Sequence, residues 1–375
     1  MVVIHIISSM GRGGKERQLS IICKYSKEVK NYIVYYNEAS SNYIAEYQLD
    51  NIIFRVTSRS LLSRITETRR LCSNLKADCI VTWGIQETLI GMIVSKLNGI
   101  PMLNFSIRHG IRQKKISHLF RSFLLHLNKY IVANSRAGLK ANNLSKGMIL
   151  YNGIENIPDF IFQKDKKVLQ KEKLGFSDKP VLVSVANLVP YKDYATVLKV
   201  LYQLKKEGKS FYYIIIGEGP CRSEIENMIR QFGMENDIFL TGSITNVEEY
   251  LRLSDVMIHS SLGEGCSNAV LEGMKVGLPI ITTRVGGTPE IVNAENAMLF
   301  EYGNTDSLYE CLNKLMTNPE LLDKMGLASN QIVKEKFSTD KMINNYEIII
   351  KAVTTKDKSM LKKLRIKADS NTNDF

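Results

Sequence analysis

Short apolar runs alternate with longer amphipathic stretches along the first half of the chain. Runs bounded by turn residues favour strands, and apolar positions spaced three and four apart favour helices. The pattern predicts strands over 2–7, 31–36, 52–56, 79–83, 101–106 and 130–135, with helices over 14–29, 61–75, 86–98 and 115–128. This strand–helix rhythm indicates a mostly parallel, doubly wound sheet.

The rhythm lapses over residues 151–163, where Pro, Asn and Gly break the pattern, and we expect a linker there. It then resumes. Strands are predicted over 181–186, 211–217, 237–242, 256–261, 278–283 and 296–300, with helices over 194–207, from Cys221, from Cys266 or Ser267 to Met274, and over 304–317, 319–336 and 339–352. The fold class is therefore α/β, with two Rossmann-like doubly wound domains facing across a cleft.

The predicted boundaries give an N-terminal domain over 1–155, a C-terminal domain over 156–338, and a final segment over 339–375. That segment is expected to be a helix returning toward the N-terminal domain, followed by a disordered tail of about a dozen residues. Ligands of open parallel sheets bind outside the carboxyl ends of the strands, so the cleft is the expected site.

Composition narrows the class of protein. Six single cysteines without a CxxC pair or a histidine cluster indicate neither a disulfide framework nor a structural metal. The first residues lack the features of a signal peptide, and no apolar run has the length of a membrane span. We expect a cytoplasmic protein.

The formal charge of +12 is concentrated in one region. Residues 88–154 contain no Asp or Glu but carry ten cations: Lys96, Arg108, Arg112, Lys114, Lys115, Arg121, Lys129, Arg136, Lys140 and Lys146. Such a region attracts nucleic acid, an anionic membrane or a phosphorylated substrate, unless it is only a solvated face. Its few aromatic residues argue against nucleic acid.

The stretch LGEGCSNAVLEGM, residues 262–274, follows a predicted strand and begins a helix. The N–H groups at such a helix start suit a phosphate or diphosphate, and the residues concerned are Gly265, Cys266, Ser267 and Asn268. Eight residues of helix rise about 12 Å. Glu264 and Glu272 would then lie too far apart for the acid/base pair of a glycoside hydrolase. They would contact different parts of one long ligand, or else be a helix-start acid and a surface residue.

Three further turns lie at strand ends. Gly286 and Gly287 follow the strand LPIITT, and Lys192 in ANLVPYKDY can neutralise a diphosphate. Gly13 and Gly14 in GRGGKERQL separate the first strand from the first helix, although neither a Walker A loop nor a full dinucleotide fingerprint is present.

In this order, the motifs resemble those of the retaining glycosyltransferases of family 4, which have the GT-B fold of two Rossmann domains. The matching stretches are GRGGKERQL, VANSRAG, LYNGI, ANLVPYKDY, IIIGEGP, EGCSNAVLE and VGGTPEIV. The resemblance implies an acceptor-binding N-terminal domain, a nucleotide-sugar-binding C-terminal domain, and a role in bacterial surface polysaccharides such as capsule or O-antigen.

The resemblance also implies roles for single residues. Glu264 would contact the donor sugar near the anomeric centre, and Glu272 the ribose. Lys192 would bind the diphosphate, assisted by the amides near Ser267 and Asn268. Gly13 and Gly14 would approach the phosphate, and His109 would lie beside the donor sugar and acceptor. As a lone histidine, His109 is equally well explained as structural or cleft-lining.

One position departs from the family pattern: Asn187 stands where many members have arginine. The diphosphate therefore has one positive charge fewer, for which Arg12 and Arg108 are candidate substitutes. The leaving diphosphate would be stabilised by Lys192 and backbone amides. No DxD motif is present, so we expect neither a metal ion nor another cofactor.

The expected substrates are a nucleotide-diphosphate-sugar, with UDP favoured, and a glycan or polyprenyl-diphosphate-linked acceptor. The segment 114–128 has apolar residues at helical spacing (Ile116, Leu119, Phe120, Phe123, Leu124 and Leu127) beside Lys114, Lys115 and Arg121. It could lie on the inner face of the plasma membrane or pack on its own sheet. Open alternatives are a nucleotide-sugar epimerase, a phosphorylase, a non-catalytic nucleotide-sugar binder and a nucleic-acid-binding protein.

Overall fold

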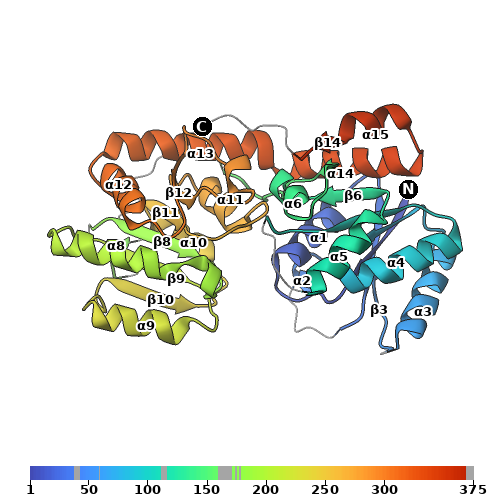
Figure 1. The fold of residues 1–375 in the computed structure, drawn as a ribbon, viewed down its shortest axis with the longest axis horizontal. Helices are drawn as coiled ribbons and strands as arrows, with labels where there is room; N and C mark the ends of the chain where they lie inside the picture. Colours follow the sequence, from blue (N-terminus) through green and yellow to red (C-terminus); the bar gives the residue numbers. More distant parts are fainter. Residues whose placement is uncertain are drawn as a thin grey trace. The chain divides into compact units, whose positions relative to one another are not determined.

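The chain forms two compact units in the computed structural model (Figure 1). The residues described are 1–37, 43–58, 60–110, 116–158, 171–173, 175–176 and 179–368, and for 116–120 the backbone alone is described. The first unit comprises Met1–Gly153 and the segment that begins at Thr339, and the second comprises Ile154–Ser338. Each is described by itself below.

The first unit is built on one sheet, whose described strands have the order β14-β7-β6-β5-β4-β1-β2-β3. All neighbours pair in parallel except β14, which is antiparallel to β7. The strands are β1 (Val2–Ile7), β2 (Lys30–Tyr35), β3 (Ile53–Arg55), β4 (Cys79–Thr82), β5 (Met102–Ile107), β6 (Tyr130–Ala133), β7 (Lys146–Ile149) and β14 (Ile366–Lys367).

Alternate side chains of these strands feed separate cores. In β1, Val3 and Ile7 face one core, whereas Ile4 and Ile6 face the other. The first core is covered by α1 (Gly14–Tyr25), α2 (Tyr43–Glu46), α14 (Thr339–Thr354) and α15 (Lys358–Leu364), and the second by α3 (Leu61–Asn74) and α4 (Ile85–Asn98). A smaller cluster lies beneath α5 (Ile116–His126) and α6 (Arg136–Ala141).

Helix α14 joins the first core through a buried polar network. The Tyr346 hydroxyl donates to Asn31 Oδ1 at 2.5 Å and lies 3.1 Å from His5 Nε2. Trp83 Nε1 donates to His5 Nδ1 at 3.1 Å, so the ring is held from both sides. Burial lowers the pKa of His5 to about 4, which keeps this imidazole neutral at physiological pH.

Two expectations for this unit are wrong. The predicted tail contains a strand, since Ile366 pairs with Gly147 and Lys367 with Lys146. The helix predicted over 115–128 is confirmed in its described part as α5, which ends at His126. Arg121 does not belong to an outer basic face, because its side chain is half-buried and its Nη2 donates to the Ser106 carbonyl at 2.6 Å. Lys114 and Lys115 lie outside the described residues.

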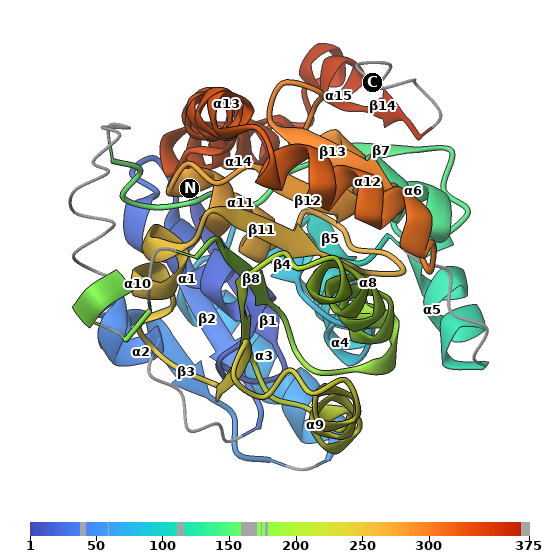
Figure 2. The ribbon, with the colours of Figure 1, turned by 90° about the vertical axis from the view of Figure 1, so that its left-hand side faces the viewer.

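The second unit has a fully parallel sheet, with its described strands in the order β10-β9-β8-β11-β12-β13. They are β8 (Val181–Val185), β9 (Tyr212–Ile216), β10 (Ile238–Gly242), β11 (Val256–His259), β12 (Ile280–Thr283) and β13 (Ala297–Phe300). Helices α8 (Tyr194–Lys206), α9 (Arg222–Gln231) and α12 (Thr305–Met316) cover the main core. The remaining helices labelled in Figure 2 are α10 (Val247–Leu253), α11 (Asn268–Lys275) and α13 (Pro319–Phe337). Helix α11 packs against α13 and against the face of β11 that is turned away from the main core.

Both sheets therefore confirm the prediction of two doubly wound α/β domains. Each reverses its strand order beside the first strand of its unit, between β1 and β4 and between β8 and β11. Such a reversal opens a crevice at the carboxyl ends, because the two following connections cross to opposite faces. Within the described parts of the chain, no helix is both long and apolar enough to span a bilayer.

Candidate functional site

The reversal between β8 and β11 brings two of the predicted site segments together. A 3₁₀ turn, Pro190–Lys192, follows β8, and residues 260–267 connect β11 to α11. The two connections are hydrogen-bonded, because the Leu262 amide donates to the Tyr191 carbonyl at 2.8 Å. Both side chains of this pair are partly exposed, Tyr191 by 39% and Leu262 by 44%.

Lys192 is held by the residue that follows it. Asp193 adopts a left-handed conformation with φ 43° and caps α8 by accepting from the amide and hydroxyl of Thr196. The same carboxylate accepts from the Gly303 amide at 3.2 Å. Since the chain turns sharply at Asp193, Lys192 stays outside the helix with only 7% of its surface exposed. Its ammonium group is directed to Glu264.

Glu264 forms an ion pair with Lys192, and its side chain is 19% exposed. The glycine turn after β12 lies against its backbone, since the Gly287 amide donates to the Glu264 carbonyl at 2.8 Å. Gly286 has φ +62°, and a Cβ built on it would lie 2.4 Å from that carbonyl oxygen. A side chain therefore does not fit there, and this explains the glycine.

His259 ends β11 beneath the ion pair. It is 3% exposed, and its Nε2 lies 3.4 Å from Ser267 Oγ. Burial, followed by the charge of Lys192, lowers the pKa of His259 to about 3, so this ring is neutral at physiological pH. The ring is thus a neutral hydrogen-bonding group close to Lys192 and to the start of α11.

The start of α11 has the features of an anion site. Ser267 is the N-cap residue, but its hydroxyl makes no capping hydrogen bond, and the first turn has no acidic residue. Helix N-termini carry partial positive charge on their amides. Cys266 and Gly265 are buried beside this turn, and Asn268 is half-buried in the first turn of the helix. Nearby, Ser260 Oγ is buried with no hydrogen-bond partner in the described structure.

The spacing argument for the two acids needs correction. The helix begins at Asn268, so Glu264 lies in the preceding loop and only four residues of helix, rising about 6 Å, lead to Glu272. The estimate of 12 Å along a helix is therefore wrong. Glu272 is half-buried, and Asn187 is exposed in the loop after β8.

Gly13, Gly14 and His109 belong to the first unit and are described within it. Gly13 is the N-cap residue of α1, and a Cβ there would lie 2.2 Å from Glu16 Oε2. The acid at this helix start is 6% exposed, and burial raises the pKa of Glu16. His109 is exposed just beyond the carboxyl end of β5.

Sequence reasoning missed several supporting residues. The sequence pattern places His259 in an apolar strand and Asp193 in the motif around Lys192. Thr283 Oγ1 donates to the Ser261 carbonyl at 2.6 Å and joins the ends of β11 and β12. For His259 and Thr283 the sequence does carry a signal, because polar residues at the carboxyl ends of buried parallel strands are typical of binding sites. Among the described residues, no cluster of His, Cys, Asp and Glu has the arrangement of a metal site.

Comparisons with known proteins find similarity to glycosyltransferases. Residues 165–331 match the family model "Glycosyl transferases group 1". The N-acetyl-alpha-D-glucosaminyl L-malate synthase of Bacillus anthracis is 27% identical over 276 residues, covering 73% of this chain and 69% of that protein. The putative glycosyltransferase EpsF of Bacillus subtilis is 25% identical over 307 residues, covering 74% of this chain and 78% of that protein.

A solved structure extends the comparison to the fold. HepE from Anabaena, crystallised with UDP, superposes with a TM-score of 0.80 at 17% sequence identity. The match covers 94% of this chain and 100% of that chain. The likeness supports the same fold, with two doubly wound domains in one chain.

Proposed function

We propose that the chain is a glycosyltransferase of the group 1 type, which transfers a hexose-type sugar from a nucleotide-diphosphate-sugar. The donor binds at the carboxyl ends of β8 and β11. Lys192 and the amides at the start of α11, Gly265 to Asn268, bind the diphosphate. Glu264 contacts the donor sugar and Glu272 the ribose.

The observation that carries this proposal is the ion pair between Lys192 and Glu264 at the strand reversal. A lysine as buried as Lys192 needs an anionic partner, and Glu264 supplies one in the protein alone. A diphosphate bound at the α11 N-terminus would share the ammonium group and release the Glu264 carboxylate to accept hydrogen bonds from sugar hydroxyls. The pair thus positions both groups before the donor arrives.

The chemistry follows from the charge that develops when the sugar leaves. The departing diphosphate gains negative charge, and a pre-placed lysine and aligned amides stabilise it without reorganisation. Asp193 and Gly286 keep the two charged groups in position. The proposed transfer retains the anomeric configuration. It uses no metal ion, because the protein groups already supply positive charge to the leaving group.

A UDP-sugar is the favoured donor, supported by the structures of Anabaena HepE in complex with UDP and with UDP-glucose. The proposed acceptor is a glycan or polyprenyl-diphosphate-linked intermediate in cell-surface polysaccharide synthesis. His109 at the end of β5 and the Gly13–Gly14 turn would serve that reaction from the first unit. A lipid-linked acceptor also supports a peripheral location on the inner face of the plasma membrane.

Thermal unfolding with a panel of UDP- and GDP-sugars tests the donor site, because a ligand that binds only the folded protein raises its stability. One nucleotide class should raise the midpoint for the wild type and for His109→Ala, but not for Lys192→Met. Turnover of that donor should need an acceptor. Stabilisation of Lys192→Met equal to that of the wild type would contradict the site, and turnover without acceptor would favour the epimerase alternative.

A further inference from the structure

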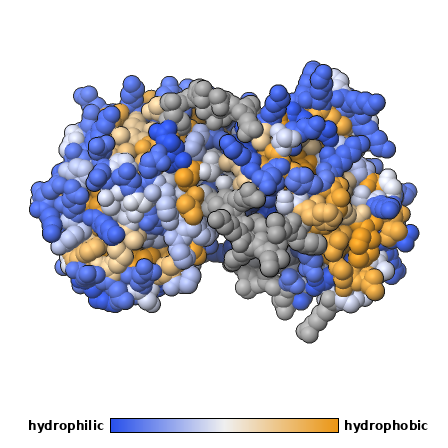
Figure 3. All heavy atoms as spheres, in the orientation of Figure 1, coloured by the Kyte–Doolittle hydropathy of each residue, from blue (hydrophilic) through white to orange (hydrophobic). Residues whose placement is uncertain are grey.

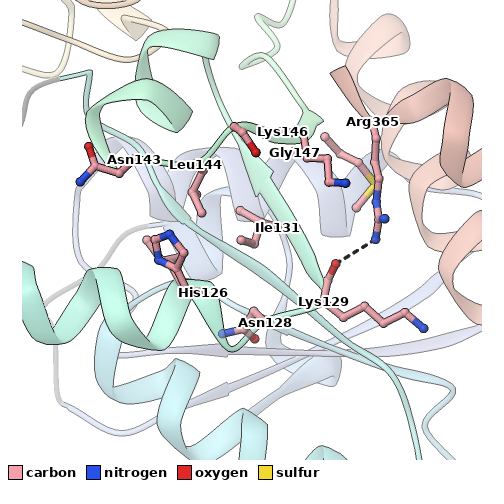
Figure 4. Close-up of a pocket in the computed structure, with 12 residues that line it drawn as sticks. His126, Asn128, Lys129, Ile131, Asn143, Leu144, Lys146, Gly147 and Arg365 are labelled. Atoms are coloured by element: carbon pink, nitrogen blue, oxygen red, sulfur yellow. Dashed lines mark hydrogen bonds between the residues drawn. The ribbon is translucent and has the colours of Figure 1, made fainter. Parts of the chain in front are cut away.

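A separate pocket lies near the β14 edge of the first sheet, in the unit that does not contain Lys192, Glu264 and Glu272. It has a volume of about 220 Å³ and is formed by the end of α5, by β6, by β7 and the loop before it, and by Arg365 from the C-terminal segment. Figure 4 shows how Arg365 reaches across the edge of the sheet toward Lys129. The proposed function uses none of these residues.

The lining is cationic. Lys129, Lys146 and Arg365 contribute to it, and no Asp or Glu does. Within the described residues, none of the lysines or the arginine forms an ion pair with a carboxylate. Two of them, Lys129 and Lys146, come from the region without acidic residues that the sequence analysis singled out. Arg365 adds a cation from outside that region.

Arg365 is hydrogen-bonded to the backbone of Lys129, and both side chains lie near one aromatic ring. Arg365 Nη2 donates to the Lys129 carbonyl at 3.0 Å. The Lys129 ammonium lies 5.2 Å and the Arg365 guanidinium 5.9 Å from the centre of the Tyr130 ring. Arginine and lysine together are a typical combination for phosphate oxygens.

We infer that this pocket binds a phosphate group, with the headgroup of an anionic phospholipid as the favoured source. The volume is below that of most drug-sized ligand sites, which suits a phosphate and its ester substituents. The inference rests on the peripheral membrane location given under the proposed function. It adds a defined headgroup site to what was only an expected basic helix.

The surroundings of the pocket favour the lipid source. Phe123 on α5 is 60% exposed, and Leu127, in the turn directly after α5, is 55% exposed. The Leu127 amide donates to the Phe123 carbonyl at 3.3 Å, so the two residues are one turn apart on the same side. Leu97 at the end of α4 is 51% exposed, and α4 packs against α5. Figure 3 shows apolar side chains gathered over this part of the first unit. An apolar surface beside a cationic pocket matches the boundary between acyl chains and headgroups.

Vesicle flotation with the full chain tests the inference. The first probe is phosphatidylcholine vesicles with and without phosphatidylglycerol, and the measured quantity is the fraction of protein bound. The second probe is inorganic phosphate in solution, and the measured quantity is the midpoint of thermal unfolding. Lys146→Gln and Arg365→Gln should each weaken binding to the anionic vesicles about fivefold, the usual effect of one cation at such a surface. Lys146→Arg should restore it.

The matched control is Lys351→Gln, which removes the same charge from an exposed position on α14 outside the pocket. It should leave vesicle binding unchanged. If Lys146→Gln and Arg365→Gln weaken binding to the anionic vesicles but leave stabilisation by inorganic phosphate unchanged, the lipid source is supported. If they abolish stabilisation by inorganic phosphate, a soluble phosphate is supported. If Lys146→Gln and Lys351→Gln behave alike with both probes, the pocket binds no phosphate group and the inference is wrong.

The two proposals can fail separately. Stabilisation by the donor nucleotide-sugar depends on Lys192 and should be the same in Lys146→Gln as in the wild type. A protein that binds donor normally and shows no pocket-specific binding would contradict the further inference alone. Pocket-specific binding without any response to nucleotide-sugars would contradict the proposed donor site alone.

Discussion

Replacing Gly286 with alanine tests whether the glycine turn after β12 positions Glu264. The added Cβ would lie 2.4 Å from the Glu264 carbonyl oxygen and 2.7 Å from its amide nitrogen. Real Cβ contacts are essentially never shorter than 3.0 Å, so the backbone must separate by at least about 0.6 Å at the first of these contacts. Glu264 would move with it, and the ion pair with Lys192 would be disturbed.

The magnitude has two parts. Alanine in a left-handed conformation costs about 1–2 kcal/mol, and overpacking costs about a further 1–3 kcal/mol. Gly233 provides the matched control, because its φ is +60° against +62° for Gly286, but a Cβ there meets nothing within 4 Å. Gly233→Ala should therefore lower the free energy of unfolding only by the cost of the left-handed conformation, without the overpacking cost.

Activity should separate the two variants further. A misplacement of about 1 Å in a catalytic group can cost about a hundredfold in rate. We expect Gly286→Ala to lose at least tenfold in sugar transfer per folded molecule, measured by nucleotide release from the donor that the thermal panel identifies, and Gly233→Ala to retain wild-type turnover. Equal losses of stability and of activity in the two variants would refute the positioning role of Gly286.

Three further predictions concern buried polar groups. Lys192→Met should lower the free energy of unfolding by about 1–3 kcal/mol, and the same substitution should cost less in a protein that already carries Glu264→Gln. Strict additivity in a double-mutant cycle measured by chemical denaturation would contradict the coupling of the two residues. Tyr346→Phe should cost about 1–3 kcal/mol, because Asn31 and His5 lose a buried partner; an unchanged denaturation midpoint would argue against the network. His5 takes up a proton near pH 6.5 in the unfolded protein but only near pH 4 in the folded protein. Its contribution to the free energy of unfolding is therefore complete above about pH 6.5 and falls by about 3 kcal/mol as the pH drops to 4. Unfolding titrations across this pH window should show a shallower acid loss for His5→Gln than for the wild type.

The sequence predicts the strands well because most are continuous apolar runs bounded by turn residues, as in VVIHII and VLVSV. These runs are buried on both faces of a parallel sheet, so the local pattern and the tertiary environment agree. The polar composition of residues 358–368, in contrast, hides the strand that they contain. Strand β14 gains its stability from pairing with β7, and nothing in its own sequence indicates a partner more than 200 positions away.

Candidate residues were easier to find than their contacts. Glycines and a lysine at strand ends pointed to Gly286 and Lys192, but the ion pair with Glu264 depends on how three connections meet beyond β8, β11 and β12. The burial of His259 is also tertiary in origin. The burial of Arg121 against Ser106 reverses its expected solvent exposure, because helical spacing alone does not tell which face meets the sheet.

The polar network around His5 has a consequence for folding during translation. Tyr346, which completes it, leaves the ribosome long after strands β1 to β7 of its own unit, since residues 154–338 are synthesised in between. At about 5–20 residues per second, this delay is on the order of 10–40 seconds. Meanwhile the core surface meant for α14 stays uncovered, so nascent chains should depend on chaperones until the last segment docks.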